Sequence, residues 1–172
     1  MRYAHCTSTA RSETMPEPHR STSSQQLPQP SVDRTPIRVG VRRSDRPMVL
    51  IVDDDPDARD MYAEYLKTMG CDVYKAKDGQ EAVKKTSELW PNVVVMDLAM
   101  PKMDGWEAIR QLHQSSWTSS IPVVAVSAIE DGREAAFAVG CDAYLMKPCT
   151  PQVLWAQIKV LLTPPDARPG YK

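Results

Sequence analysis

The sequence predicts an α/β protein built on a doubly wound sheet of five parallel strands, with helices on both faces. Across residues 47–163, short apolar runs alternate five times with amphipathic segments, which is the pattern of repeated strand–helix units. The run Val93–Met96 has four consecutive apolar residues, as expected for a strand buried on both faces of a parallel sheet. Pro91 precedes this run, and Pro101 and Gly105 follow it, so its length is that of a strand.

The first unit combines a strand at Met48–Val52 with a helix that begins after Asp55. Asp55 suits the N-cap position and Pro56 the first helical position, while Gly70 is a usual helix terminator. The inward stripe of this helix is predicted to contain five apolar residues: Met61, Tyr62, Tyr65, Leu66 and Met69.

The next two units repeat this pattern. A strand at Asp72–Ala76 and a turn at Asp78–Gly79 precede a second helix, whose inward face is predicted to carry Ala82, Val83, Thr86 and Leu89. The third unit is the central strand, Asn92–Met96, followed by a helix from about Trp106 to Gln114.

The last two units complete the sheet. A strand at Ile121–Val126 precedes a short helix at Gly132–Val139, which Gly140 closes. A strand at Ala143–Met146 precedes a last helix that Thr150 caps and Pro151 opens. The inward stripe of that helix is predicted to contain Val153, Ile158, Leu161 and Leu162.

Composition limits the classes of function. The 172 residues are 42% hydrophobic and 25% charged, as in one globular domain with some unstructured sequence. A net charge of −1 gives no general case for nucleic acid or an anionic membrane as the main partner, so specific nucleic-acid binding is not expected. The longest uncharged apolar stretch, Ile121–Ile129, is far shorter than the roughly 20 residues of a membrane-spanning helix. The four cysteines lack metal-ligand spacing, which favours reduced thiols and a cytoplasmic setting; they are Cys6, Cys71, Cys141 and Cys149.

Residues 1–46 are predicted to be a disordered tail rich in Arg, Ser and Pro. The tail carries eight arginines and four acids, hence +4 against −5 for the remainder. It has too few large apolar residues to offset the entropy of ordering it. An organelle transit peptide, or a start codon assigned too early because Met48 opens the first strand, are alternative interpretations. The predicted organisation is this tail, a folded domain at 47–163 and a short tail at 164–172, with no output domain.

Polar side chains are predicted to converge at one edge of the sheet. Right-handed crossovers leave the strands parallel, so Asp53 and Asp54, Asp97, Ser127 and Lys147 all follow strands at the same edge. In the flavodoxin-like order 2-1-3-4-5 the first and third strands are neighbours, which brings three carboxylates together. Mg²⁺ suits such a cluster, because oxygen ligands are hard and no His or Cys is near. Taken alone, the acids after the first strand are better explained as a helix N-cap with acids that favour the helix dipole, but their convergence with Asp97 favours metal binding.

These motifs resemble the signature of response-regulator receiver domains of two-component systems, here of a stand-alone type. They are Val52-Asp53-Asp54, Met96-Asp97 with Met100-Pro101, Asp104-Gly105, Ser127-Ala128 and Lys147-Pro148. The resemblance implies that Asp97 is a phosphoacceptor served by a histidine kinase or a histidine phosphotransfer protein. It implies that Asp54, Asp97 and the backbone carbonyl of Ala99 bind Mg²⁺, with Asp53 holding the ion through water.

The resemblance also implies how the signal leaves the site. Ser127 would hydrogen-bond a phosphoryl oxygen, and Tyr144 would be the switch aromatic. Lys147 would form ion pairs with the site in both states, and the peptide bond between Lys147 and Pro148 would be cis. The surface of the fourth helix, fifth strand and fifth helix would then bind an unknown downstream protein, or a second copy of the chain. The protein would phosphorylate and dephosphorylate itself with Mg²⁺ rather than act as an enzyme on another substrate.

Several alternatives remain open at this stage. Ser127 and Tyr144, taken singly, fit a capping hydroxyl and a half-buried core ring as well as they fit a switch. A phosphorylation-independent module of this fold would normally lack one of the site residues, and all are present. A hydrolase with an aspartyl-phosphate intermediate usually needs an acid where this chain has Ala99. The segment between Ser127 and Lys147 is slightly short for the family, which predicts a trimmed loop before the fourth helix.

Overall fold

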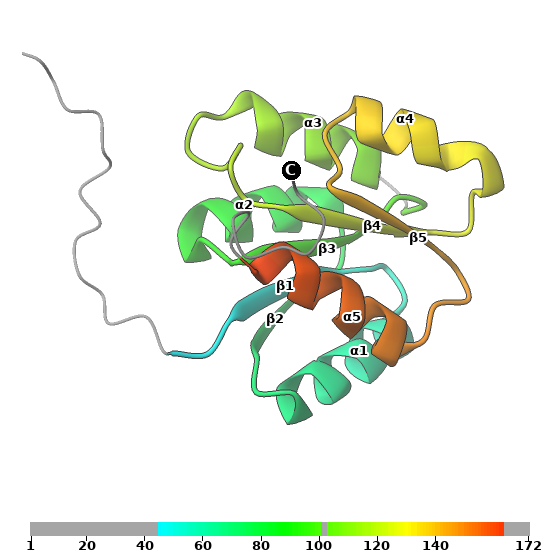
Figure 1. Cartoon of the computed structure of the whole chain (residues 1–172). Helices are drawn as coiled ribbons and strands as arrows, with labels where there is room; N and C mark the ends of the chain where they lie inside the picture. Colours follow the sequence, from blue (N-terminus) through cyan, green and yellow to red (C-terminus); the bar gives the residue numbers. More distant parts are fainter. Residues whose placement is uncertain (1–44, 101–102, 164–172) are drawn as a thin grey trace, which may run out of the picture. The chain divides into compact units, whose positions relative to one another are not determined.

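The computed structural model describes residues 45–100 and 103–163 (Figure 1). In chain order its elements are β1 (Met48–Val52), α1 (Pro56–Thr68), β2 (Asp72–Ala76), α2 (Gly79–Leu89), β3 (Val93–Asp97), α3 (Gly105–Gln114), β4 (Val123–Ser127), the 3₁₀ helix η1 (Glu130–Gly132), α4 (Arg133–Ala138), β5 (Ala143–Met146) and α5 (Pro151–Leu162). Pro101 of the quoted motif, the C-terminal tail and nearly all of the N-terminal tail lie outside the described residues, so the predicted tails remain predictions.

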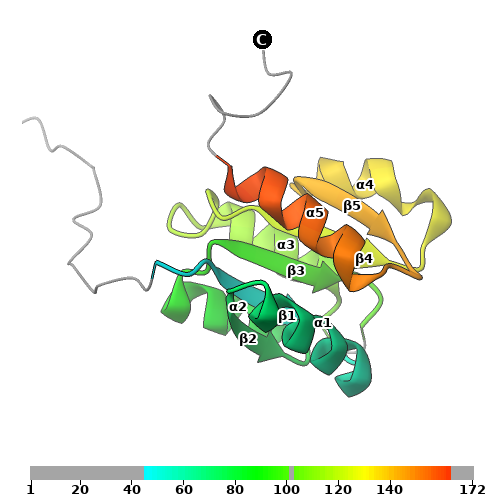
Figure 2. The same cartoon turned by 60° about the horizontal axis from the view of Figure 1, so that its bottom comes forward.

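The strands form one parallel sheet in the order β2-β1-β3-β4-β5, which confirms the predicted fold class and strand order. Helices α1 and α5 cover one face of the sheet, and α2, α3 and α4 cover the other (Figures 1 and 2). The strand ends that carry the predicted site residues therefore share one edge, as right-handed crossovers require.

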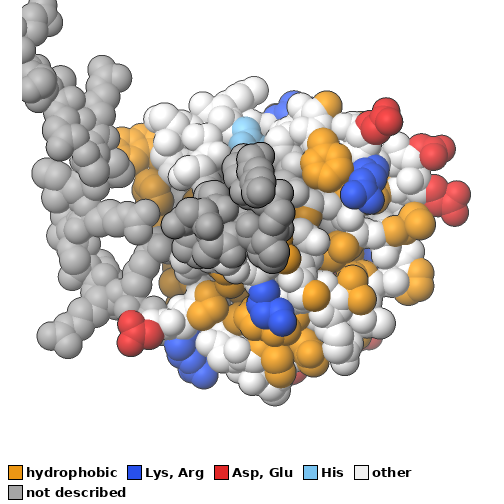
Figure 3. Space-filling model, viewed as in Figure 1, with side chains coloured by type: hydrophobic (Ala, Val, Ile, Leu, Met, Phe, Trp, Pro, Cys, Tyr) orange, Lys and Arg blue, Asp and Glu red, His pale blue; other side chains and the backbone are white. Residues whose placement is uncertain are grey.

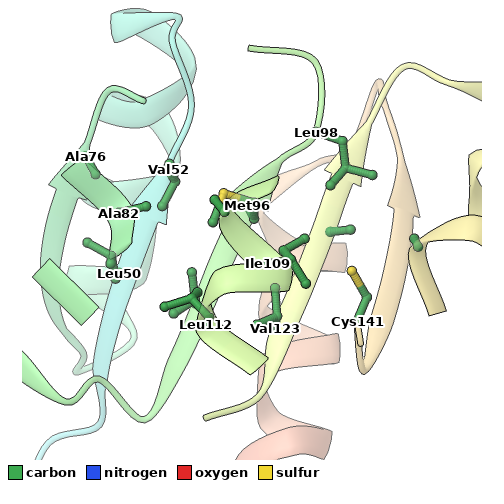
Figure 4. Packing of buried hydrophobic residues seen from close by; sticks show 14 of the residues in the cluster. Leu50, Val52, Ala76, Ala82, Met96, Leu98, Ile109, Leu112, Val123 and Cys141 are labelled. Atoms are coloured by element: carbon green, nitrogen blue, oxygen red, sulfur yellow. The ribbon is translucent and has the colours of Figure 1, made fainter. Parts of the chain in front are cut away.

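The hydrophobic core consists of two layers, one on each face of the sheet. Every residue of β3 is buried, as its unbroken apolar run predicts. On the face covered by α2 and α3, Leu50 and Met96 from the strands pack with Ala82, Ile109 and Leu112 from the helices (Figure 4). The opposite layer joins α1 and α5 to the sheet through Tyr62, Leu66, Leu154 and Ile158.

Helix starts follow their capping residues. The side chain of Asp104 accepts a hydrogen bond from the Glu107 N–H at 2.8 Å, so α3 begins at Gly105 and not at Trp106 as expected.

Strand β4 begins at Val123 and not at Ile121, because Pro122 has no N–H to donate to a neighbouring strand. Helix α4 is limited to six residues and follows η1, so the segment is shorter than the predicted helix Gly132–Val139.

Two predicted inward stripes were partly wrong. Met61 on α1 and Met69 at its C-cap are exposed, at 46% and 39%, whereas Tyr62, Ala63 and Leu66 of α1 are buried. On α5, Val153 is 50% exposed, and Leu154, which the stripe omitted, is fully buried beside Ile158. In both helices the apolar residues span a wider arc than the sheet can cover, and packing between α1 and α5 selects the buried part.

The face formed by α4, β5 and α5 exposes several large apolar side chains. Figure 3 shows apolar side chains scattered among charged ones in the view that carries these elements. The large apolar residues that are exposed on α4, β5 and α5 are Phe137, Met146, Val153 and Val160.

Of the helices in residues 45–100 and 103–163, none combines the length and the hydropathy of a membrane span. Within the same ranges the three cysteines are free thiols.

Candidate functional site

Strand register brings the predicted acids together at the carboxyl edge of the sheet. Val52 pairs with Met96, so Asp53, the next residue, lies beside Asp97 at the end of β3. Carboxylate oxygens of Asp53, Asp54 and Asp97 all lie within 4.8 Å of one another. Asp53 and Asp97 are 3% and 5% exposed, whereas Asp54 is exposed. The site therefore has two buried acids and one that faces solvent.

Lys147 supplies the positive charge for this acidic cluster. Its Nζ donates to Oδ2 of Asp97 at 2.7 Å and to Oδ2 of Asp53 at 2.8 Å. Burial lowers the pKa of Lys147, but the hydrogen bonds to the two carboxylates outweigh burial and raise that pKa above its ordinary value. Lys147 consequently stays charged. The Lys147–Pro148 peptide is cis, as the resemblance implied.

Backbone groups orient the two buried carboxylates. Oδ1 of Asp97 accepts the Ala99 N–H at 2.9 Å, and Oδ1 of Asp53 accepts the Asp55 N–H at 2.9 Å. In each carboxylate, Oδ1 accepts a backbone N–H two residues further along the chain, and Oδ2 accepts a hydrogen bond from Lys147. Burial is the main cause of the raised pKa of Asp53, and the Lys147 hydrogen bond opposes it. The Ala99 carbonyl as a metal ligand stays a prediction.

Gly105 allows α3 to approach the strand end that carries Asp97. A Cβ at this position would lie 2.7 Å from the Cα of Leu98 and would also meet the Asp97 carbonyl oxygen. The Gly105 N–H donates to the Leu98 carbonyl at 3.3 Å. A side chain here would push apart α3 and the backbone next to the predicted phosphoacceptor, which explains glycine after the capping Asp104.

The two predicted switch residues meet at one residue of the β4–α4 loop. The fully buried Ser127 accepts the Ile129 N–H on Oγ at 3.2 Å. Tyr144, which is 8% exposed, points inward and donates its hydroxyl hydrogen to the Ile129 carbonyl. The N–H of Lys147 donates to the Ser127 carbonyl at 2.8 Å, which ties the ends of β4 and β5. The structure thus brings all the predicted side chains to one edge of the sheet.

Two residues of α1 that sequence reasoning did not place at the site also support it. Arg59 donates from Nη1 to the Asp53 carbonyl at 2.6 Å. The hydroxyl of Tyr62 donates to the Cys149 carbonyl at 2.8 Å, joining α1 to the loop before α5. Burial raises the pKa of Tyr62 to about 12, so the hydroxyl remains a donor. The only sequence signal for Arg59 was its short separation from Asp53, six residues along the chain. No sequence pattern indicated the contact between Tyr62 and Cys149, which are 87 residues apart.

The donor set at the edge fits Mg²⁺. Three carboxylates offer only hard oxygen ligands, their oxygens already lie within 4.8 Å of one another, and the exposed Asp54 leaves one side open for coordinated water. The residues that could hold such an ion are Asp54 and Asp97, with Asp53 close to both.

Comparisons with known proteins agree with this geometry. Residues 49–159 match the family model of the response regulator receiver domain. Protein PilG of Pseudomonas aeruginosa is 34% identical over 132 residues, which cover 73% of this chain and 97% of PilG. The DNA-binding dual master transcriptional regulator RpaA of Synechocystis is 33% identical over 72% of this chain, but this chain spans only 52% of RpaA.

Solved structures agree as well. The chemotaxis response regulator CheY4 of Vibrio cholerae superposes with a TM-score of 0.64 at 28% identity, covering 67% of this chain and 98% of that one. The fold and the acidic edge define an α/β receiver module, and the chain belongs to the response regulator receiver domain family of two-component systems. Domains of this family take phosphoryl groups from histidine kinases and generally bind Mg²⁺ in an acidic site.

Proposed function

We propose that Asp97 accepts a phosphoryl group from a phosphohistidine of a histidine kinase or a histidine phosphotransfer protein. One observation carries the proposal: Asp97 is held at Oδ1 by the Ala99 N–H, 2.9 Å away, and at Oδ2 by Lys147, 2.7 Å away. A carboxylate fixed at both oxygens beside an open acidic cluster is positioned as a nucleophile. A structural acid at a strand end would not need a partly buried lysine shared with a second, buried acid.

The residues around Asp97 each supply part of the transfer. An oxygen of Asp97 forms the new bond to phosphorus while the bond from phosphorus to the donor imidazole breaks, and the imidazole keeps the electron pair and takes a proton. Lys147 neutralises charge on the phosphoryl oxygens, and the Ser127 hydroxyl can donate to one of them. Mg²⁺, held by Asp54, Asp97 and the Ala99 carbonyl with Asp53 behind water, would add further neutralisation of that charge.

The modified site is proposed to act on the surface formed by α4, β5 and α5. The aspartyl phosphate adds negative charge and acceptor oxygens beside Ser127, and Ser127 and Tyr144 both bind the backbone of Ile129. Exposed apolar side chains on the same surface offer contact area for a downstream protein or for a second copy of the chain: Phe137, Met146 and Val153. The protein is proposed to lose the phosphoryl group from its own Asp97 by hydrolysis and to act on no other phosphorylated substrate.

Phosphotransfer from purified histidine kinases tests this function. A panel of kinases carrying radiolabelled phosphohistidine is mixed with the protein, with Mg²⁺ or with a chelator. We expect at least one kinase to label the native chain only with Mg²⁺, and the label to be absent from Asp97→Asn. Asp60→Asn changes an exposed acid of α1 that pairs with Lys75, so it should be labelled normally. Undiminished labelling of Asp97→Asn would contradict the proposal.

A further inference from the structure

Gly132 is the last residue of η1 and the N-cap of α4, and its backbone conformation does not require glycine. Its φ of −77° and ψ of −10° fall in the right-handed helical region, where alanine is favoured over glycine. The residue is buried. Backbone conformation alone therefore predicts that Gly132→Ala would be tolerated, and the reason for a glycine must be sought in the space around it.

The space around Gly132 is filled by the switch tyrosine. A Cβ added at Gly132 would lie 2.9 Å from the Tyr144 hydroxyl oxygen, closer than real Cβ contacts, and 3.2 Å from Cγ2 of Ile129. The Ile129 side chain is 40% exposed and can move aside. The Tyr144 hydroxyl cannot move without losing its hydrogen bond to the Ile129 carbonyl, and its ring is buried.

We propose that Gly132 is a positioning residue that lets Tyr144 point inward. The absence of a side chain at Gly132 leaves the space that the Tyr144 hydroxyl occupies, and that hydroxyl binds the Ile129 carbonyl together with the Gly132 N–H, which donates at 3.3 Å. The Ile129 N–H donates a hydrogen bond to Ser127 Oγ at 3.2 Å. Gly132 thereby controls, through one tyrosine and one loop residue, how Ser127 is presented to Asp97. This inference rests on the proposed phosphoacceptor function.

A methyl group at position 132 should act on the site mainly through the tyrosine hydroxyl, because its contacts with Cγ2 and Cβ of Ile129, at 3.2 and 3.3 Å, are less close than the 2.9 Å contact with that hydroxyl. The Tyr144 hydroxyl is the nearest atom in the way, and it is the one atom that distinguishes Tyr144 from phenylalanine. Gly132→Ala should therefore displace the ring of a tyrosine and leave the ring of a phenylalanine in place. A general effect of alanine on the backbone of η1 and α4 would be the same with either ring.

The test is a double-mutant cycle on the full chain: native, Gly132→Ala, Tyr144→Phe and the double variant. The readout is the affinity for beryllofluoride with Mg²⁺. We expect Gly132→Ala to weaken that affinity on the order of five- to tenfold in the tyrosine background, as couplings between linked sites usually do, and by less than about twofold in the phenylalanine background. Equal weakening in both backgrounds, or no weakening with Tyr144 present, would overturn the inference.

A second readout needs no phosphoryl analogue and separates the two proposals. In NMR spectra recorded without Mg²⁺ or analogue, cross-peaks between the Tyr144 ring and Ile129 should be present in the native chain and lost in Gly132→Ala. In urea unfolding, Gly132→Ala should lower the midpoint with Tyr144 and raise it with Tyr144→Phe. If the cross-peaks and midpoints behave so but the native chain binds no beryllofluoride, the phosphoacceptor function fails and the placement stands. Cross-peaks that persist in Gly132→Ala refute the inference whatever the analogue does.

Discussion

Lys147 and Asp97 are 50 residues apart in the chain, and their side chains meet at the carboxyl edge of the sheet with Nζ 2.7 Å from Oδ2. The same ammonium binds Asp53 at 2.8 Å. One cation thus serves two buried carboxylates, and the Lys147 side chain itself is 26% exposed. Removing it would leave two acids that are close together, buried and unneutralised.

Lys147→Met should therefore destabilise the fold and strengthen Mg²⁺ binding. Loss of one partner from a buried ion pair costs roughly 3–5 kcal/mol in the free energy of unfolding, and the partial exposure of Lys147 places this variant at the lower end of that range. Mg²⁺ affinity should rise because a positive charge no longer opposes the ion. Urea unfolding and calorimetric titration measure the two effects, with Lys84→Met on the exposed side of α2 as the control. An unchanged Mg²⁺ affinity would show that Lys147 does not neutralise the proposed ligands.

Cys141 should make stability fall at alkaline pH. Burial, and to a lesser degree the Asp142 carboxylate, raise the pKa of this thiol from 9.0 to about 12. Because the folded value lies above the unfolded one, the folded chain keeps its proton while the unfolded chain loses it. The stabilisation is complete below pH 9 and decreases as pH rises toward 12.

Stability measured against pH tests this. From this thiol we expect a loss on the order of 1 kcal/mol per pH unit across that range, so Cys141→Ala should reduce the slope, while Tyr62, whose pKa is also raised, keeps part of it. Val139→Ala removes a neighbouring apolar side chain without removing a titrating group, so it should lower stability and keep the slope. An identical slope in Cys141→Ala and the native chain would contradict the prediction.

The strands and the acidic edge were predictable because local patterns determine them. The unbroken run before Asp97 required a strand buried on both faces, and the residues closing β1, β3, β4 and β5 had to share an edge once the strands were parallel. Asp104 also carried the signal for the start of α3, although the helix was placed one residue late.

What the sequence could not predict depends on contacts between distant elements. Met61 and Val153 are apolar like their buried neighbours, and only the packing of α1 and α5 against the sheet leaves them exposed. The hydrogen bond from Tyr62 to the Cys149 carbonyl spans 87 residues. The significance of Gly132 appears only when the position of the Tyr144 hydroxyl is known.

The side chains of Ala99 and Ile129 should make the phosphorylated state long-lived. These residues lie two positions beyond Asp97 and Ser127, both are exposed, and neither offers a group to orient an attacking water. The double variant Ala99→Asn, Ile129→Glu should lose phosphate faster, on the order of tenfold, if water positioning limits the rate. Decay of labelled protein with Mg²⁺ and no kinase measures this. Ile129→Leu keeps the backbone groups that bind Ser127 and Tyr144, so it should decay like the native chain; a double variant no faster than that control would rule out water positioning.

Phosphorylation of Asp97 is the central claim, and mass spectrometry of the intact protein after incubation with acetyl phosphate and Mg²⁺ tests it most directly. The native chain should gain the mass of one phosphoryl group, borohydride reduction should map that group to Asp97, and a chelator should suppress the gain. Asp97→Asn should gain nothing, whereas Asp60→Asn should behave as the native chain. A phosphoryl group carried equally by Asp97→Asn, or mapped in the native chain to another residue, would contradict the account.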